Sequence, residues 1–245
     1  MREPLLGENM GVEAGFRCRG REVNRIESFS DAAFAFALTL MVVSLEVPKT
    51  FAELKATMRG FPGFAICFAW LVSIWFQHYR FFRRYGMQDG FTMLLNWVLL
   101  FVVLFYVYPL KFLFTYLMAR VFGGPRQVLT DADAPLLMTI YGLGFAAVYV
   151  VLGLMFWHAY RHREELRLDA RERILTVASL RGMFLYASVG VLSITIVQIG
   201  GAGWAAAAGF SYCLIGAASA LNGWYAGTRM RKLADDSPRM PAAST

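Results

Sequence analysis

Six long apolar stretches constrain the fold of this chain more than any other feature of its sequence. They cover residues 29–47, 61–76, 93–117, 136–157, 182–199 and 204–226. A helix needs roughly 20 mostly apolar residues to cross a hydrocarbon core about 30 Å thick. The stretches are apolar on all sides and do not alternate, which indicates helices and not barrel strands. The sequence therefore predicts an all-α polytopic membrane protein with six transmembrane helices.

The remaining residues leave no room for a second, soluble domain. Hydrophobic residues make up 58% of the 245 positions, well above the level of an ordinary soluble domain. We expect residues 1–24 to be a cytoplasmic N-terminal tail and residues 25–232 to be the transmembrane domain. Residues 233–245 are small, polar and proline-containing, which predicts a disordered tail.

Basic residues predict the orientation of the chain. They gather in the alternate segments 17–25, 80–84, 161–173 and 229–232. Lysine and arginine in short loops stay on the cytoplasmic side, so both termini are predicted to be cytoplasmic. The net charge of +7 follows from this topology and does not indicate a nucleic-acid-binding surface.

Segment 161–173 mixes charges of both signs and is predicted to be a short solvated helix. A multi-pass protein of the cell membrane, surrounded by lipid, is expected.

Charged and polar residues at the start of the first stretch are the sharpest anomaly. Arg25, Ser30 and Asp31 lie where a carboxylate in or near hydrocarbon costs several kcal/mol unless it finds a partner. One interpretation is a buried polar network. The alternative is that Asp31 caps the N-terminus of the helix.

A stripe of residues follows on the same helix. Phe29, Ala32, Phe36, Thr39 and Val43 recur at spacings of three, four, three and four, which places them on one face. Such a face is typical of a bundle core, and it is also what a pore lining would need. The sequence pattern alone leaves both interpretations open.

Histidines offer few candidate ligands. Trp75 and His78 share one face of the second predicted helix, and His158 and His162 are spaced i, i+4 at the end of the fourth. No partner ligands for a metal are visible around His78. The spacing of His158 and His162 would suit a metal or haem site, but they lie amid arginines, so no metal site or cofactor is predicted. The chain also contains no carbonyl filter loop, arginine-repeat voltage sensor, Walker loop or nucleophile elbow. An enzyme is therefore not expected.

The motif that begins at Arg25 resembles a known family signature. Arg25, Phe29, Ser30 and Asp31 match the Arg-xxx-Phe-Ser-Asp signature of the transmembrane protein 175 family of potassium channels, in its prokaryotic six-helix form. Trp75-Phe-Gln-His78 resembles the Trp-xx-His element of the family's second helix. Leu95-Asn96 and Pro109 resemble its third helix, so the likeness covers at least residues 25–117.

The resemblance implies a homotetramer whose four first helices line a central pore. It places the hydrophobic constriction at Phe36, a threonine that contributes to cation selectivity at Thr39, and a second apolar ring at Val43. It also implies that Arg25, Ser30, Asp31, Trp75 and His78 form a structural polar network. The family commonly has isoleucine or leucine at the main constriction, so Phe36 is a departure.

These expectations combine into a potassium-preferring cation channel without a bound cofactor, in which K⁺ is the permeating ion. A proton-permeable leak channel of the same fold is the first alternative. A non-conducting membrane scaffold is the second. No nucleic-acid partner is expected, and a bacterial inner membrane is the expected location.

Overall fold

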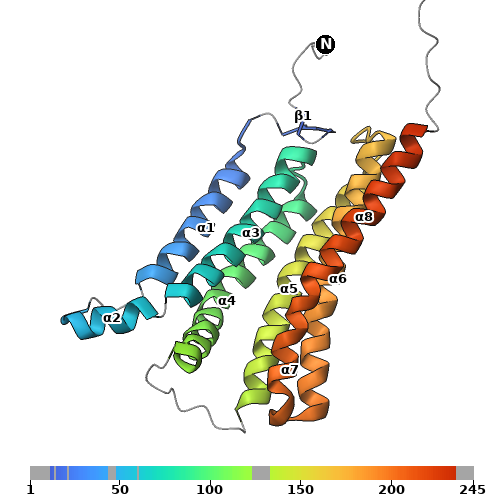
Figure 1. Cartoon of the computed structure of the whole chain (residues 1–245). Helices are drawn as coiled ribbons and strands as arrows, with labels where there is room; N and C mark the ends of the chain where they lie inside the picture. The colour runs from blue at the N-terminus through green and yellow to red at the C-terminus, as the bar shows by residue number, and fades with distance from the viewer. Residues whose placement is uncertain are drawn as a thin grey trace, which may run out of the picture.

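The computed structural model describes residues 12–13, 15–20, 22–43, 48–59, 61–122 and 133–235, which form a bundle of long helices (Figure 1). The long elements are α1 (Arg25–Val43), α3 (Phe61–Tyr85), α4 (Gly90–Phe122), α5 (Ala134–Arg161), α6 (Ala170–Gly200) and α8 (Leu214–Asp235). The short elements are β1 (Val12–Glu13), β2 (Phe16–Arg17), α2 (Phe51–Arg59), η1 (Ala202–Trp204), α7 (Ala205–Phe210) and η2 (Ser211–Cys213).

Most of these helices are suited to a membrane. Among the described residues, 5 helical stretches are long and apolar enough to cross one: 61–85, 90–110, 134–161, 170–200 and 202–233. Helix α1 is not among them, and it carries Arg25, Glu27 and Asp31 near its start. It runs alongside α3 and α4 (Figure 1). The all-α, polytopic membrane fold predicted from the sequence is confirmed.

The chain passes back and forth so that its two described ends lie together. Helix α1 begins, and α8 ends, at the end of the bundle where β1 lies (Figure 1). The basic segments predicted to be cytoplasmic meet at this end, which we call the basic end. Helix α2 lies crosswise at the opposite end of α1.

Several helices extend beyond the apolar stretches that predicted them. Helix α3 continues past residue 76 to Tyr85, and α6 begins at Ala170 rather than at residue 182. The prediction of a separate solvated helix over 161–173 is wrong. Asp169 and Glu172 form a capping box, in which each side chain accepts a hydrogen bond from the other residue's backbone, so α6 starts one residue after Asp169.

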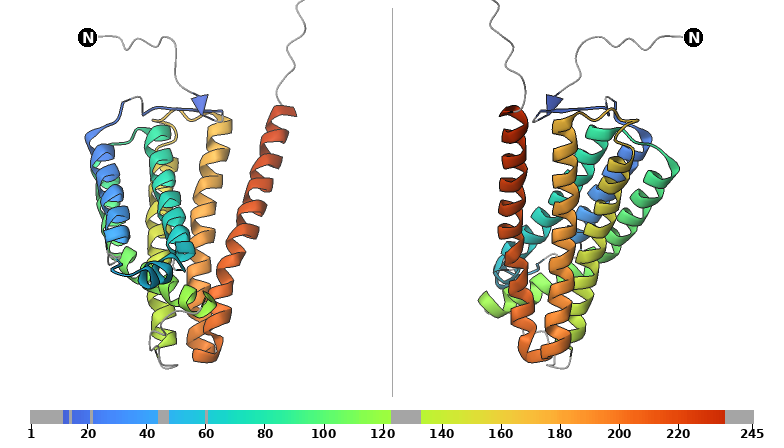
Figure 2. Two further views of the ribbon diagram at one scale, coloured as in Figure 1. Left: turned by 60° about the vertical axis from the view of Figure 1, so that its left-hand side comes forward. Right: turned by 90° about the vertical axis from the view of Figure 1, so that its right-hand side faces the viewer.

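The helices pack as a row from α1 through α3 and α4 to α5, α6 and α8 (Figures 1 and 2). Helices α5 and α6 make the most extensive contact in the bundle. Gly142 permits this contact, because a Cβ atom there would lie 2.9 Å from the carbonyl oxygen of Gly190. Helix α8 packs chiefly on α6 and stands at the outer edge (Figure 2).

The segment predicted as an N-terminal tail is partly ordered against the bundle. Strands β1 and β2 pair antiparallel, and the Phe16 ring is fully buried against Tyr85 at the end of α3. At the other terminus, α8 continues to Asp235, and the rest of the predicted C-terminal tail lies outside the described residues.

Candidate functional site

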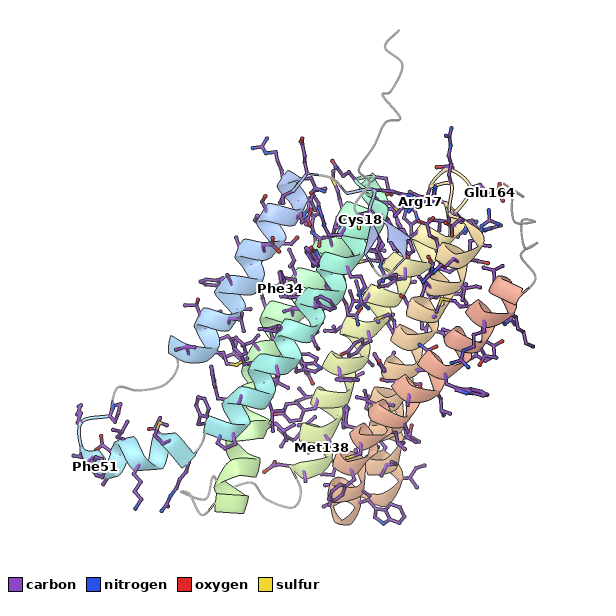
Figure 3. The ribbon with its side chains drawn as sticks, turned by 45° about the horizontal axis from the view of Figure 1, so that its top comes forward. Arg17, Cys18, Phe34, Phe51, Met138 and Glu164 are labelled. Carbon is purple, nitrogen blue, oxygen red and sulfur yellow. The ribbon has the colours of Figure 1, made fainter. Side chains whose placement is uncertain are left out.

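The inner face of α1 packs against the rest of the subunit. Its buried residues recur at spacings of three and four, as one stripe of a helix does, and they are Glu27, Ser30, Phe34, Ala37 and Met41. Phe34 is 3% exposed and lies between α1 and α3 (Figure 3). Small Ala37, with no exposed surface, lets α1 approach its neighbours closely. This face is therefore part of the subunit core.

A chain of hydrogen bonds joins this inner face to α3 and α4. His78 Nε2 lies 2.8 Å from Asn96 Oδ1, Asn96 Nδ2 donates to Ser30 Oγ over 2.9 Å, and the Ser30 hydroxyl donates to the Ile26 carbonyl over 2.8 Å. All three polar side chains are fully buried. Because Asn96 Oδ1 can only accept, His78 Nε2 carries the hydrogen.

The same chain of bonds indicates that His78 is neutral. His78 Nδ1 is buried and has no hydrogen-bond partner among the described residues. An imidazole that donates through Nε2 can leave Nδ1 unprotonated, whereas a charged ring would bury an unpaired N–H. The Ser30–Asn96–His78 bonds thus hold α1 through neutral groups, which are less costly to bury than ions.

Asp31 makes a separate contact one residue further along. Its Oδ1 accepts a hydrogen bond from Trp75 Nε1 on α3 over 2.8 Å. The alternative in which Asp31 caps the helix is wrong, because Asn24 does so: its Oδ1 accepts from the Glu27 backbone N–H over 2.8 Å. Asp31 instead lies in the second turn, where it ties α1 to α3.

Arg25 does not join these contacts. It is exposed at the first residue of α1, and no hydrogen bond or ion pair found among the described residues involves it. The five residues predicted as one network therefore divide. Ser30 and His78 are joined through Asn96, Asp31 and Trp75 are joined directly, and Arg25 stands apart.

The outer face of α1 carries the predicted stripe. Phe29 is 62% exposed and Phe36 is 57% exposed, and Ala32 and Thr39 are also exposed. Phe29, Ala32, Phe36 and Thr39 are therefore not part of the core of this subunit. Val43 is the last residue of α1, and its side chain lies outside the described part of the structure.

Thr39 presents a free acceptor on the outer face. Its hydroxyl donates to the Ala35 carbonyl one turn earlier over 2.9 Å. That bond uses the hydroxyl hydrogen and leaves lone pairs of the oxygen available. An exposed oxygen whose hydrogen is already engaged can accept from water or coordinate a cation.

A second polar cluster, at the basic end, was not predicted. Glu172 has no exposed side-chain surface, and its Oε2 lies 2.6 Å from Arg19 Nη2 and 3.2 Å from Arg17 Nη2. These arginines precede α1 and lie more than 150 positions from Glu172 in sequence. The cluster anchors the segment that leads into α1 to the start of α6 (Figure 3 labels Arg17). Segment 161–173 mixes charges of both signs, and nothing in it indicates that one of its glutamates would be buried.

The histidines at the end of α5 contact Asp89 and their own helix. Among the described residues, no group of three or more histidine, cysteine, aspartate or glutamate side chains is placed to hold a metal ion. His158 Nε2 lies 2.9 Å from Asp89 Oδ2, and the His162 ring contacts the His158 carbonyl. Burial alone would raise the pKa of the Asp89 carboxyl. Hydrogen bonds from Thr92 and His158 outweigh this effect and lower the pKa below its ordinary value. This pair joins α5 to the start of α4.

Comparison with known proteins identifies relatives that span most of the chain. A potassium channel from Marivirga tractuosa is 44% identical over 200 residues, which cover 78% of this chain and 81% of the relative. A potassium channel from Streptomyces collinus is 27% identical over 157 residues, covering 61% of this chain and 71% of that protein.

Solved structures agree with the sequence relatives. A crystallised variant of the potassium channel MtTMEM175, in complex with a nanobody–MBP fusion protein, matches with a TM-score of 0.77 and 40% identity, covering 89% of this chain and 99% of that one. A lysosomal potassium-selective channel TMEM175 homologue from Chamaesiphon minutus shares the fold, with a TM-score of 0.55 and 22% identity over 81% of this chain and 96% of that one.

The family model described as endosomal/lysosomal potassium channel TMEM175 matches residues 25–106. This range holds α1, the Ser30–Asn96–His78 hydrogen bonds and the Asp31–Trp75 contact. Together with the 44% identical relative, the match shows that this chain belongs to the TMEM175 family.

Proposed function

We propose that this chain forms a potassium-preferring channel in which the outer face of α1 lines the ion pathway. The chain is a multi-pass membrane protein of a potassium-channel family. One subunit cannot enclose a pathway with a single outward-facing helix face. We therefore assign the pore to the axis of a homotetramer, where four copies of α1 meet.

One observation carries this proposal: Phe36 and Thr39 face outward while the opposite side of α1 is fixed to its own subunit. Other exposed faces of the subunit differ in composition. Helix α4 exposes bulky aromatic groups, with Trp97 60%, Phe101 71% and Phe105 71% exposed. The outer face of α1 also exposes two aromatic groups, Phe29 and Phe36, but between them it carries the small residue Ala32, and the Thr39 hydroxyl follows. Small side chains allow helices to approach closely around an axis. A surface that faces lipid needs neither small side chains nor a hydroxyl group.

Phe36 is assigned the hydrophobic constriction. Four phenyl rings on a common axis would exclude water, and a dewetted ring is a barrier to a hydrated cation. Val43 would form a second apolar ring two turns further along the same stripe. No carbonyl filter loop is involved in this arrangement.

Thr39 is assigned the selectivity position. Its hydroxyl hydrogen is engaged with Ala35, so four copies would present four oxygen acceptors toward the axis. Hydroxyl oxygens can replace part of the hydration shell of a cation. The Ser30–Asn96–His78 bonds and the Asp31–Trp75 contact would hold each α1 at the orientation that this arrangement needs.

The test is a measurement of reversal potentials with purified protein in liposomes under K⁺, Na⁺ and pH gradients. A potassium-preferring channel shifts its reversal potential with the K⁺ gradient. A reversal potential that follows the pH gradient would show the proton-permeable alternative. Zero current from protein that runs as an intact oligomer would overturn the conduction proposal and leave a membrane scaffold. We also propose that this protein is located in a bacterial inner membrane.

A further inference from the structure

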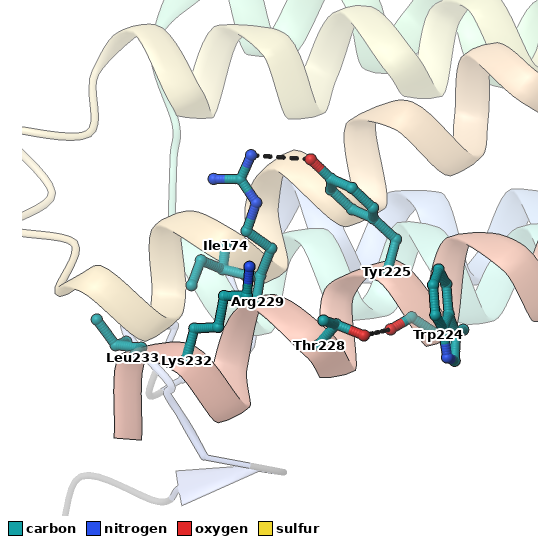
Figure 4. Close-up of a pocket in the computed structure, with 7 residues that line it drawn as sticks. All are labelled: Ile174, Trp224, Tyr225, Thr228, Arg229, Lys232 and Leu233. Carbon is teal, nitrogen blue, oxygen red and sulfur yellow. Dashed lines mark hydrogen bonds between the residues drawn. The ribbon is translucent and has the colours of Figure 1, made fainter. Parts of the chain in front are cut away.

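A cavity lies between α6 and α8 near the basic end (Figure 4), and these two helices stand on the side of the bundle away from α1 (Figure 1). Its volume is about 560 Å³. Seven residues line it, six of them from α8: Ile174, Trp224, Tyr225, Thr228, Arg229, Lys232 and Leu233. The lining is aromatic toward the bundle centre, and toward the basic end it holds two cations, Arg229 and Lys232, beside apolar Ile174 and Leu233.

The two cations of this cavity lack a described counter-charge. No ion pair found among residues with described side chains involves Arg229 or Lys232. The acidic groups at the nearby start of α6 are already engaged, because Glu172 and Asp169 both pair with Arg17. The cavity therefore offers a positive charge that the described protein does not neutralise.

Two contacts with Tyr225 orient Arg229 at the cavity. Its Nη2 donates to the Tyr225 hydroxyl over 2.8 Å (Figure 4), and its guanidinium lies 5.3 Å from the centre of the Tyr225 ring. A second cation, Arg181 of α6, lies over the same ring at 4.3 Å. A guanidinium oriented in this way keeps other N–H groups free to donate to an anion.

The outer face of α8 continues from the cavity as an apolar strip. Leu214 is 49% exposed, Leu221 67% and Trp224 71%, and these residues are spaced along the helix toward its start. A ligand that matches the whole surface needs an anionic group at the Arg229 and Lys232 end and an apolar chain along the strip. Phospholipids with an anionic headgroup combine these two features.

We propose that the cavity between α6 and α8 binds an anionic phospholipid, with its phosphate at Arg229 and Lys232 and an acyl chain along Leu221 and Trp224. Aromatic residues such as Trp224 and Tyr225 are typical of the depth at which headgroups begin. Because the cavity lies at the basic end, the bound lipid would belong to the leaflet that faces the cytoplasm in the predicted topology. This inference rests on the membrane fold and not on the assignment of the pore.

The test is native mass spectrometry of the full-length oligomer in neutral detergent with added phosphatidylglycerol, phosphatidylcholine or inorganic phosphate. We expect retention of phosphatidylglycerol well above that of the other two. The double variant Arg229→Gln/Lys232→Gln should weaken phosphatidylglycerol binding about 25-fold, from about fivefold for each of the two basic residues near an anionic lipid.

Arg231→Gln is the matched control, because Arg231 is exposed on the same turn of α8 but does not line the cavity. It should change binding by less than about twofold. Equal losses in the control and the double variant would overturn the site, as would undiminished binding in the double variant. Inorganic phosphate that competes as well as the lipid would show a free-anion site. A change of oligomer size in the double variant would show a contact between subunits instead of a lipid site.

Discussion

Helix α1 presents two faces that differ in composition and in what they contact. The inner face buries Phe34 and joins Ser30 to Asn96 and His78 by hydrogen bonds. The outer face exposes Phe36 and Thr39, and the Thr39 hydroxyl bonds only to its own helix among the described residues. The inner face therefore determines where α1 lies, and the outer face is free to act on something outside the subunit.

The difference between these faces separates two kinds of mutational effect. A change on the inner face removes packing or leaves buried polar groups unpaired, so it should lower stability. A change on the outer face removes nothing that this subunit needs for folding. If the outer face lines a pore, such a change should alter conduction while stability stays nearly constant.

The largest expected effect on stability comes from Phe34→Ala. Loss of a fully packed phenyl ring leaves a cavity and costs about 3 to 5 kcal/mol. Phe36→Ala, two residues away on the exposed face, is the matched control and should cost much less. Thermal unfolding of the two purified variants in the same detergent measures the difference. Equal destabilisation would show that Phe36 is also packed, in a contact between subunits.

Asn96→Ala should have the next largest effect. Asn96 satisfies both His78 Nε2 and Ser30 Oγ, and each buried group left without a partner costs about 1 to 3 kcal/mol. The expected result is a lower unfolding temperature and a lower yield of oligomer, with the K⁺ over Na⁺ preference of the surviving channels unchanged. Altered selectivity at wild-type stability would move Asn96 from a positioning role into the ion pathway.

Asp31→Ala should be moderately destabilising, because it removes the acceptor for Trp75 Nε1, and hydrogen bonds to charged groups contribute about 1.5 to 3 kcal/mol. Arg25→Ala, at an exposed position without a described partner, should change stability by less than about 0.5 kcal/mol. Comparison of oligomer yields after extraction checks both. Similar losses for the two variants would indicate that Arg25 finds its partner on another subunit.

Thr39→Val should change stability least and selectivity most specifically. Valine keeps the shape of threonine and removes the oxygen that four subunits would present to the ion. The reversal potential in mixed K⁺ and Na⁺ should move toward the value of a channel that does not distinguish the two ions, while the oligomer remains intact. An unchanged reversal potential would exclude the Thr39 hydroxyl from selection.

The fold was largely predictable because membrane spans are encoded locally. Apolar stretches and the positions of arginine gave the helices, and the spacing of Phe29 to Thr39 placed those residues on one face. Helix ends were less predictable. The capping box at Asp169 starts α6 within a charged segment, where an apolar stretch gives no signal.

The contacts of the candidate site depend on residues that lie far apart in sequence, and these were predicted less well. Ser30 and Asn96 are 66 positions apart, and nothing local to Asn96 indicates that it bridges Ser30 and His78. Likewise, the burial of Glu172 depends on Arg17 and Arg19 at the other end of the chain. Arg25 carries the family signature, yet the motif alone did not reveal that it faces outward within the subunit.

Ion flux through Phe36→Ala, normalised to the amount of oligomer in the liposomes, tests the outer-face assignment most directly. Removal of four phenyl rings from a dewetted constriction should raise the normalised K⁺ current, and Phe36→Asn should raise it further and reduce selectivity, because water re-enters the pore. A normalised current that falls in Phe36→Ala, from oligomers of wild-type stability, would contradict the assignment of Phe36 as the constriction.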